Sequence, residues 1–151
     1  MKFKNIFFLT MIFAVFLIAS TNGITKESNF FDKGIEFFKK KDYEKSKIQF
    51  EKDIVFDPKS EKSYLYLAKI FYEKDNDEEQ EINLNNVLLL NPKNEEAIYL
   101  LALLKIKQSD YKKANELIEK FALVCRSFCS KKEEMKSKLE KIIPDNEKSK
   151  N

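Results

Sequence analysis

Histidine is absent from this chain of 151 residues, and glycine, proline and cysteine are scarce, with two, three and two residues respectively. Without histidine, the commonest general base and the commonest imidazole metal ligand are missing. So few glycines and prolines argue against an all-β chain, which needs many tight turns, and favour helices. Charged residues make up 35% and hydrophobic ones 43% of the chain, a composition typical of a soluble globular protein with one domain.

The segment 1–23 has the layout of a secretory signal peptide. Lys2 and Lys4 form a basic start, and an apolar run follows from residue 6 to about residue 19, which is short for a membrane span. Small and polar residues come next, and we place the cleavage after Gly23. The alternative is that the segment is retained as a membrane anchor. We therefore expect an exported protein, located in the periplasm or cell envelope of a bacterium, or otherwise in the secretory pathway.

Cleavage would leave the chain almost neutral. The complete sequence has 28 basic and 25 acidic side chains, and loss of Lys2 and Lys4 leaves 26 basic ones, so the net charge becomes +1. A nucleic-acid-binding domain usually carries a clear excess of positive charge. The composition therefore predicts that nucleic acid is not a partner.

Two short motifs recur along the chain at a fixed period of 34. Asp57-Pro58 returns one period later as Asn91-Pro92, and Asp42-Tyr43 returns two periods later as Asp110-Tyr111. Units that begin at residues 27, 61 and 95 align so that the fourth position is large and apolar, the eighth is small, and the twenty-fourth is again large and apolar. The three columns are Phe30, Tyr64 and Ile98; Gly34, Ala68 and Ala102; and Phe50, Leu84 and Ile118.

Each unit divides into two helices. In the first unit Phe30, Gly34 and Phe37 follow helical spacing, and a polar break separates them from a second helix over about residues 43–56. Asp57 ends this helix because a following proline disfavours the helical backbone. A period of 34 built from helix pairs predicts stacked hairpins, in which each hairpin covers the apolar face of its neighbour.

These units resemble tetratricopeptide (TPR) repeats over about residues 27–128. The matching residues are Phe30, Gly34, Phe37, Tyr43, Phe50 and Pro58 in the first unit; Tyr64, Leu67, Ala68, Phe71, Leu84, Val87 and Pro92 in the second; and Leu101, Ala102, Tyr111, Ala114, Ile118 and Phe121 in the third. The chain departs from the family pattern at Lys33, Asp53, Gln80 and Lys105, where the family has apolar, small or aromatic residues. We expect these departures to affect the packing of the first unit's outer edge and of the second hairpin.

The expected architecture is an all-α, TPR-like α-solenoid of three helical hairpins plus a C-terminal capping helix. The domain covers residues 27–143, with repeats at 27–60, 61–94 and 95–128 and the capping helix at 131–143. Met135, Leu139 and Ile142 give that helix one apolar face, as the end of an open stack requires. Residues 144–151 form a polar tail that we expect to be disordered.

Cys125 and Cys129 are the only cysteines, and in an exported chain such a pair predicts a disulfide. Thiols at i and i+4 on one straight helix are poorly placed for a bridge, so a disulfide predicts that the helix breaks at about residues 126–128. Reduced packing residues or a redox-active pair are the alternatives, although the spacing is not that of thiol oxidoreductases. No metal site is expected, because two thiols without histidine cannot complete a tetrahedral shell.

The resemblance also implies a partner-binding groove, lined by fixed positions of the first helix of each hairpin. The groove residues with this assignment are Phe31, Ile35, Phe38, Leu65, Lys69, Tyr72, Tyr99, Leu103 and Ile106. They lie outside the core columns, and most are apolar, so we expect them to form an exposed patch that a partner peptide or helix covers. The alternatives are coverage by a neighbouring subunit, by the chain's own N-terminal segment, or through tight curvature of a short stack.

TPR domains that clamp the C-terminal carboxylate of chaperones carry Lys and Asn at the fifth and ninth positions of their first unit. Here these positions hold Phe31 and Ile35, so we do not expect that clamp.

The sequence therefore predicts a non-catalytic protein-binding adapter or scaffold of the cell envelope or periplasm, without a cofactor. No phosphate-binding loop or catalytic set of side chains is visible in it. The alternatives are a self-assembling structural protein, in which case the chain forms homo-oligomers, and a thiol-redox protein that uses Cys125 and Cys129. A membrane association is expected only if the N-terminal segment is retained.

Overall fold

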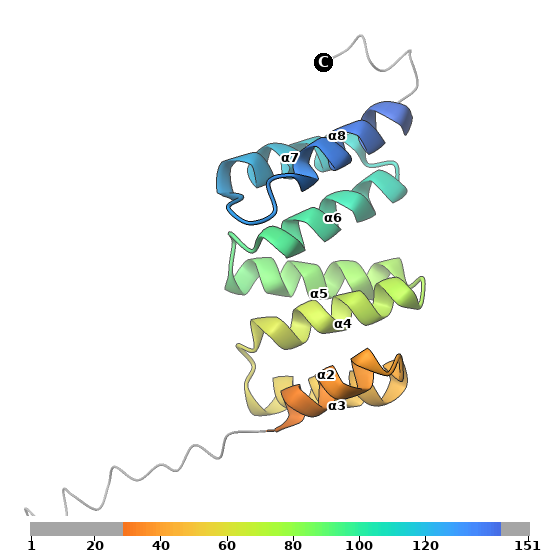
Figure 1. Ribbon diagram of the computed structural model, residues 1–151, viewed down its shortest axis with the longest axis vertical. Helices are drawn as coiled ribbons and strands as arrows, with labels where there is room; N and C mark the ends of the chain where they lie inside the picture. The colour runs from red at the N-terminus through yellow and green to blue at the C-terminus, as the bar shows by residue number, and fades with distance from the viewer. Residues whose placement is uncertain (1–28, 143–151) are drawn as a thin grey trace, which may run out of the picture.

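The structure, a computed structural model, describes residues 29–142, and every element in that range is an α-helix (Figure 1). The helices are α2 (Phe30–Lys39), α3 (Tyr43–Phe56), α4 (Glu61–Glu73), α5 (Asp77–Leu90), α6 (Glu95–Lys107), α7 (Tyr111–Val124) and α8 (Lys131–Ile142). The expected signal peptide and the polar tail lie outside the described residues. Within residues 29–142, none of the helices has the length and hydropathy needed to cross a membrane.

The helices pack as three consecutive hairpins, α2 with α3, α4 with α5, and α6 with α7. The hairpins stack in chain order, and α8 closes the stack by packing against both α6 and α7. In Figure 1 the first helices of the hairpins and α8 lie toward the viewer, and α3, α5 and α7 lie behind them. The all-α solenoid of three hairpins with a terminal capping helix, expected from the period of the sequence, is confirmed.

The first and second helix of each hairpin are joined by the same turn. Lys41, Asp75 and Ser109, which occupy the same position in successive repeats, have left-handed backbone angles of φ 58°, 53° and 61°. In the first turn the N–H of Asp42 donates to the carbonyl of Phe37 at 3.0 Å, which closes the C-terminus of α2. Glycine usually occupies such a position because it has no Cβ to clash with the backbone. This chain uses other residues in all three described hairpins.

The residue after the left-handed one starts the second helix. Asp42, Asn76 and Asp110 each accept a hydrogen bond from the backbone N–H at position i+3, at 3.3, 3.1 and 3.0 Å. Such a cap satisfies one of the N–H groups that the first helical turn leaves unpaired. The Asp-Tyr pair seen in the sequence is therefore the start of a second helix, at residues 42–43 and again at 110–111.

The core follows the aligned columns of the repeat. Phe50, Leu84 and Ile118 are fully buried at the twenty-fourth position. Opposite Phe50, a Cβ at Gly34 would lie 2.5 Å from its ring, so any larger residue would force the ring or the helix to shift. The small eighth position of the repeat thus lets the two helices of a hairpin approach closely.

Asp53, a departure from the family pattern, lies in a buried polar contact between the first two hairpins. Its side chain is 5% exposed, and Oδ2 accepts hydrogen bonds of 2.6 Å from the hydroxyls of Ser60 and Ser63. The packing at this position therefore differs from the family pattern. The two serines supply the hydrogen bonds that the buried carboxyl group of Asp53 requires.

The other departures are accommodated locally. Gln80 is buried, at 2% exposure, without separating α4 from α5, which remain in close contact. Lys105 Nζ lies 2.6 Å from Glu81 Oε1 and ties α6 to α5. Lys33 is exposed, so its charge meets water rather than the core.

Candidate partner-binding groove

The nine predicted groove residues lie on α2, α4 and α6, the helices that face the viewer in Figure 1. The structure divides them into three groups: those that join adjacent hairpins, those that belong to the core, and those that border an open hollow. Of the nine, only Tyr72 is exposed, whereas Tyr99 and Leu103 are half-buried, as Phe31, Ile35 and Phe38 are.

Phe31, Ile35 and Phe38 belong to the first group. The ring of Tyr66 on α4 lies 5.9 Å from the ring of Phe31 and 5.1 Å from that of Phe38, measured between centroids. Both contacts are edge-to-face, an arrangement that stabilises aromatic pairs beyond simple burial. All three predicted residues are partly buried against the cluster around Phe50. We expected an exposed patch at these positions, whereas Tyr66 of α4 packs against Phe31 and Phe38.

Leu65 and Ile106 belong to the second group, with exposed fractions of 8% and 4%. Both are members of the main hydrophobic core. Both positions lie outside the aligned core columns of the repeat, but their side chains are buried and do not belong to an exposed patch. Their side chains fill the space between adjacent hairpins, which the period of the sequence does not reveal.

Lys69 lies between the second and third hairpins and is already engaged. Its Nζ is 2.7 Å from Glu96 Oε1 on α6 and 4.6 Å from the centroid of the Tyr66 ring. An ammonium group over an aromatic face is stabilised by the ring's quadrupole. The positive charge of Lys69 therefore joins hairpins and is not held ready for an acidic partner.

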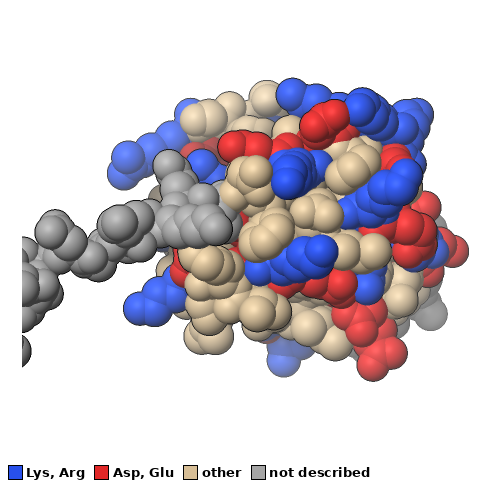
Figure 2. All heavy atoms as spheres, turned by 90° about the horizontal axis from the view of Figure 1, so that it is seen from below, with Lys and Arg blue, Asp and Glu red and all other residues tan. Residues whose placement is uncertain are grey.

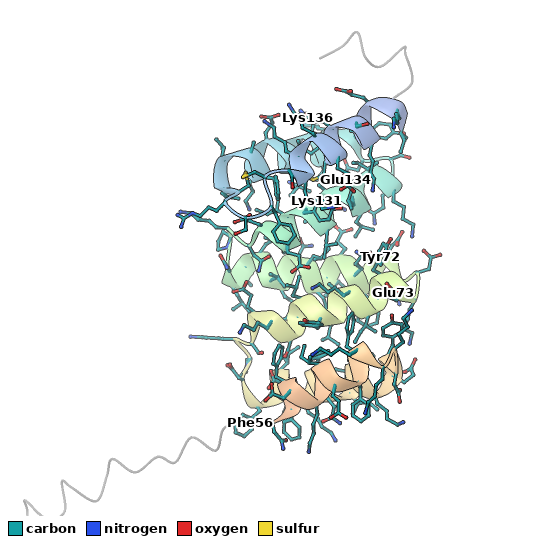
Figure 3. The ribbon with its side chains drawn as sticks, in the orientation of Figure 1. Phe56, Tyr72, Glu73, Lys131, Glu134 and Lys136 are labelled. Carbon is teal, nitrogen blue, oxygen red and sulfur yellow. A yellow bond between two sulfur atoms is a disulfide. The ribbon has the colours of Figure 1, made fainter. Side chains whose placement is uncertain are left out.

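Tyr72, Tyr99 and Leu103 border an open hollow of about 560 Å³. Tyr72 is 62% exposed, and Figure 3 shows it near the C-terminal end of α4. The hollow is lined by Tyr72, Gln80, Tyr99, Leu100, Leu103, Leu104, Ile106, Lys107, Lys138 and Ile142, which come from α4, α5, α6 and α8. The groove is thus open at its C-terminal half, where α8 supplies one wall.

The lining includes residues that are not among the nine predicted ones, and two of them, Lys138 and Ile142, come from α8. Ile142 was expected on the apolar face of the capping helix with Met135 and Leu139. The latter two are buried, but Ile142 is 48% exposed at the edge of the hollow. The sequence contained a signal for the exposure of Ile142, because the last residue on the apolar face of a helix often lies beyond the surface that the helix covers.

A polar cluster attaches α8 to α6 beside the hollow (Figure 3). The hydroxyl of Tyr99 donates to Glu134 Oε1 at 2.9 Å, and the ammonium groups of Lys131 and Lys138 lie 2.7 and 3.1 Å from the same carboxylate. The hydrogen bonds from Lys131, Lys138 and Tyr99 lower the pKa of Glu134 to about 2. Burial, and then the adjacent Glu134 carboxylate, raise the pKa of Tyr99.

The lysine on the opposite side of the hollow is also paired. Lys107 Nζ lies 2.5 Å from Asp75 Oδ1 and 2.7 Å from Asp77 Oδ1. Hydrogen bonds to these two carboxylates raise the pKa of Lys107 to about 12. The charges around the hollow are therefore balanced within the chain, and its apolar and aromatic side chains provide the contact surface.

The cysteine pair lies in the turn that precedes α8. α7 ends at Val124, and the Cα atoms of Cys125 and Cys129 are 5.2 Å apart with the sulfurs within bonding distance. Glu95 at the start of α6 accepts hydrogen bonds from the backbone N–H groups of Ser127 and Phe128 at 3.0 and 2.9 Å. The turn that orients the capping helix is thus held from within the same repeat.

Among the residues that the structure describes, no group of three or more histidine, cysteine or acidic side chains is arranged to hold a metal ion.

Stacked hairpins of this kind define an α-solenoid repeat protein. Comparison with solved structures identifies the fold more closely. The TPR domain of Arabidopsis OM64 superposes with a TM-score of 0.69 at 18% identity, covering 76% of this chain and 93% of that one. The first TPR domain of Spaghetti (RPAP3), bound to the HSP90 peptide SRMEEVD, gives 0.69 at 16% identity and covers 80% and 98%. The Sgt2 TPR domain of Aspergillus fumigatus gives 0.64 at 19% identity, covering 75% and 78%.

The chain therefore has the tetratricopeptide-repeat fold, and the resemblance inferred from the aligned columns is confirmed at the level of the fold. No family model and no curated protein matches the sequence.

Proposed function

We propose that this protein is a non-catalytic adapter of the cell envelope that holds a segment of a partner protein in the C-terminal half of its concave groove. The single observation that carries the proposal is the open hollow of about 560 Å³ between α4, α6 and α8, with Tyr72 62% exposed at its border. An accessible, largely apolar hollow on a repeat protein is a surface that a partner's side chains can fill. The TPR fold supports the same class, since its members commonly scaffold protein assemblies.

The chemistry of the hollow indicates what the partner presents. Tyr99, Leu103 and Ile142 offer apolar surface, while Lys107 and Lys138 at the border are already paired with acidic side chains of this chain. Binding would therefore depend on burial of apolar side chains, at about 25 cal/mol per Å² removed from water, and less on attraction of a charged terminus. The partner segment we propose has two or more apolar side chains, and its charges lie away from them.

We do not propose that this chain binds a partner in the way the Spaghetti domain does. That domain is described in complex with an HSP90 peptide ending in EEVD. In this chain the positions expected to clamp such a carboxylate hold Phe31 and Ile35, and both are packed against the first two hairpins. An acidic C-terminal peptide would meet apolar side chains there instead of donors.

Export is the second part of the proposal, and the sequence of residues 1–23 supports it. The cysteine pair supports it too, because Cys125 and Cys129 lie at the Cα separation of a disulfide, 5.2 Å. N-terminal sequencing of the native protein tests export, with a start at Ile24 expected. A start at Met1 would mean retention of the segment and would replace the exported adapter by an anchored one.

The disulfide is tested on the same preparation. We expect Cys125 and Cys129 to resist alkylation under native conditions and both to react after reduction, which mass spectrometry detects. Reaction of both thiols in the unreduced native protein would show that the pair is not bridged.

The groove is tested by photo-crosslinking in the cells that produce the protein. A photoreactive side chain at Tyr72 is expected to capture one distinct protein, whereas the same probe at the exposed Lys113 on α7 is not. The captured protein is identified by mass spectrometry, and its binding is then measured with purified components. Leu103→Asp should weaken that binding about tenfold or more by placing a charge in the hollow.

The matched control is Leu123→Asp, which makes the same change at a side chain that is 87% exposed on α7, away from the hollow. It should leave binding unchanged. Equal capture from Tyr72 and Lys113, or binding that is insensitive to Leu103→Asp, would exclude the groove as the binding site.

A further inference from the structure

The second helices of the first two hairpins carry an unusual outward face. In α3 this face consists of Ile48, Glu51, Lys52 and Val55, spaced i, i+3, i+4 and i+7, so that the four side chains form one stripe. Val55 is 83% exposed and Ile48 is 47% exposed. A helix of a globular protein normally places charged or polar residues at such outward positions.

The same stripe recurs at the equivalent positions of the next repeat, in α5, as Ile82, Asn85, Asn86 and Leu89. Leu89 is 80% exposed and Ile82 is 47% exposed, values that nearly repeat those of Val55 and Ile48. We call the eight residues of α3 and α5 the outer stripe. Its helices, α3 and α5, lie behind α2 and α4 in Figure 1, whereas the predicted groove residues lie on α2, α4 and α6.

Next to the α3 part of the stripe the surface is hollowed. Phe30, Ile48, Glu51, Lys52, Val55 and Phe56 line a second hollow of about 560 Å³. Phe56 is 55% exposed, and Figure 3 shows it at the end of the stack where α2 and α3 lie. Figure 2 shows this end of the stack, where uncharged side chains lie among acidic and basic ones. Apolar surface that is contiguous, rather than scattered, indicates an interface.

The order of residues along the stripe is self-complementary. In both helices an apolar residue stands at each end and a polar pair stands in the middle. If α3 of a second copy runs antiparallel, about a two-fold axis between residues 51 and 52, Ile48 of one copy faces Val55 of the other. The same operation places Glu51 opposite Lys52, and it does so twice. In α5 it places Ile82 opposite Leu89 and Asn85 opposite Asn86.

We propose that the outer stripe is a homodimer interface, in which two copies meet about a two-fold axis with α3 antiparallel to α3 and α5 antiparallel to α5. In such an isologous interface each contact occurs twice, so one complementary pair of charges gives two ion pairs. Glu51 Oε1 already lies 2.7 Å from Lys47 Nζ, and Lys52 of the second copy would approach the same carboxylate. The charge pattern thus selects a second copy of this chain as the occupant.

The third hairpin marks the limit of the interface. On α7 the equivalent positions hold Glu116, Glu119, Lys120 and Leu123. Glu116 stands where α3 and α5 have isoleucine, and the antiparallel arrangement would place it opposite Leu123, which is unfavourable. A membrane surface fits the stripe less well than a second copy, because Lys52 is its only basic residue and α5 adds none.

The test is the mass of the native, processed protein as a function of concentration, measured by sedimentation equilibrium. We expect a reversible dimer. Val55→Glu and Leu89→Glu change side chains that are already exposed, so the fold is retained, and each should weaken dimerisation about a hundredfold. Tyr72→Glu, the same kind of change at a side chain that is 62% exposed on α4, away from the outer stripe, is the control and should leave the dimerisation constant unaltered.

A charge exchange tests the antiparallel pairing itself. Glu51→Lys and Lys52→Glu, each alone, place like charges opposite one another and should weaken the dimer about tenfold. The double variant Glu51→Lys/Lys52→Glu restores opposite charges and should restore the dimer. Failure of the double variant to recover would overturn the proposed pairing.

Two other outcomes overturn the proposal as a whole. One is a protein that stays monomeric up to about 1 mM. A monomer that binds through Val55 to vesicles of phosphatidylglycerol and phosphatidylcholine counts as the same outcome. The other is a dimer that is indifferent to both Val55→Glu and Leu89→Glu. Neither outcome bears on the concave groove, whose predicted residues lie on α2, α4 and α6.

Discussion

The hydroxyl of Ser63 on α4 donates a hydrogen bond of 2.6 Å to Asp53 Oδ2 on α3. Both side chains are buried, with exposed fractions of 0% and 5%, and the bond links the first hairpin to the second. A small apolar residue is usual at the position of Asp53 in the family that the sequence resembles. The contact is therefore a polar replacement for what would otherwise be apolar packing between adjacent repeats.

Ser63→Ala should lower the free energy of unfolding by about 1–3 kcal/mol, because it leaves a buried carboxyl oxygen with one hydrogen bond fewer. Urea denaturation measures the change. Ser137→Ala, at an exposed position of α8, is the matched control and should stay within about 0.5 kcal/mol of the wild type. In an Asp53→Ala background the effect of Ser63→Ala should nearly vanish, and a full effect there would assign the loss to packing instead of the hydrogen bond.

Gly34→Ala should destabilise the protein even though alanine favours helices by about 1 kcal/mol over glycine. The added Cβ would lie 2.5 to 2.8 Å from three atoms of the Phe50 ring, so the ring or α2 must move. Overpacking of this kind costs about 1–3 kcal/mol. Thermal unfolding measures the change, and Phe50→Leu in the same chain should recover part of the loss. An increase in stability for Gly34→Ala alone would contradict the close approach of α2 and α3.

Lys41→Gly should stabilise the protein by about 0.5–1 kcal/mol. In the left-handed conformation of Lys41, φ 58°, a residue with a Cβ is strained by about 1–2 kcal/mol, and glycine avoids this strain. Glycine loses more backbone entropy on folding, which offsets about 0.5–1 kcal/mol of the gain. Lys33→Gly, an equal change inside α2 where the backbone is helical, should instead destabilise by about 1 kcal/mol. Urea denaturation of both variants gives the two signs, and two losses would contradict the left-handed turn.

The attachment of α8 should weaken in acid. The pKa of Glu134 is lowered from 4.5 to about 2 in the folded protein, so its contribution to stability is present above about pH 4.5 and is lost as the pH falls toward 2. Other acidic groups with lowered pKa values, Glu36 and Glu95 among them, change in the same direction. The contribution of Glu134 is therefore the difference between the wild type and Glu134→Gln.

The difference in free energy of unfolding between the wild type and Glu134→Gln should shrink between pH 4.5 and pH 2. Urea denaturation of both proteins at each pH measures it. Glu133→Gln, at an exposed position directly before Glu134, is the matched control. Its free energy of unfolding should differ less from that of the wild type at each pH. A difference that stays constant over this interval would mean that the three donors do not act on the charged carboxylate.

The peptide SRMEEVD should not bind measurably to this protein at concentrations at which it occupies a TPR domain that has the carboxylate clamp. Phe31 and Ile35 supply no donors, and Lys69 is paired with Glu96. Isothermal titration calorimetry checks this, with a TPR domain that carries the clamp as the positive control. Saturable binding that Phe31→Ala abolishes would contradict the assignment.

The sequence by itself determined the number of hairpins and the places where helices start and stop. These depend on local chemistry: Asp42 and Asp110 cap helices through their own side chains, and Pro58 ends one through its ring. The small eighth position at Gly34 was equally visible, since the fixed period of the repeat reports contacts that every repeat makes in the same way.

Only the tertiary structure decided which groove side chains are open. Leu65 and Tyr72 are both groove positions of one helix, yet the first is 8% and the second 62% exposed. The exposure of a side chain between repeats depends on the curvature of the stack and on the size of the residue that arrives from the next helix, such as Tyr66 beside Phe31. The same holds for the outer stripe, because Val55 is visible as an apolar residue in the sequence, but its exposure depends on what packs around it.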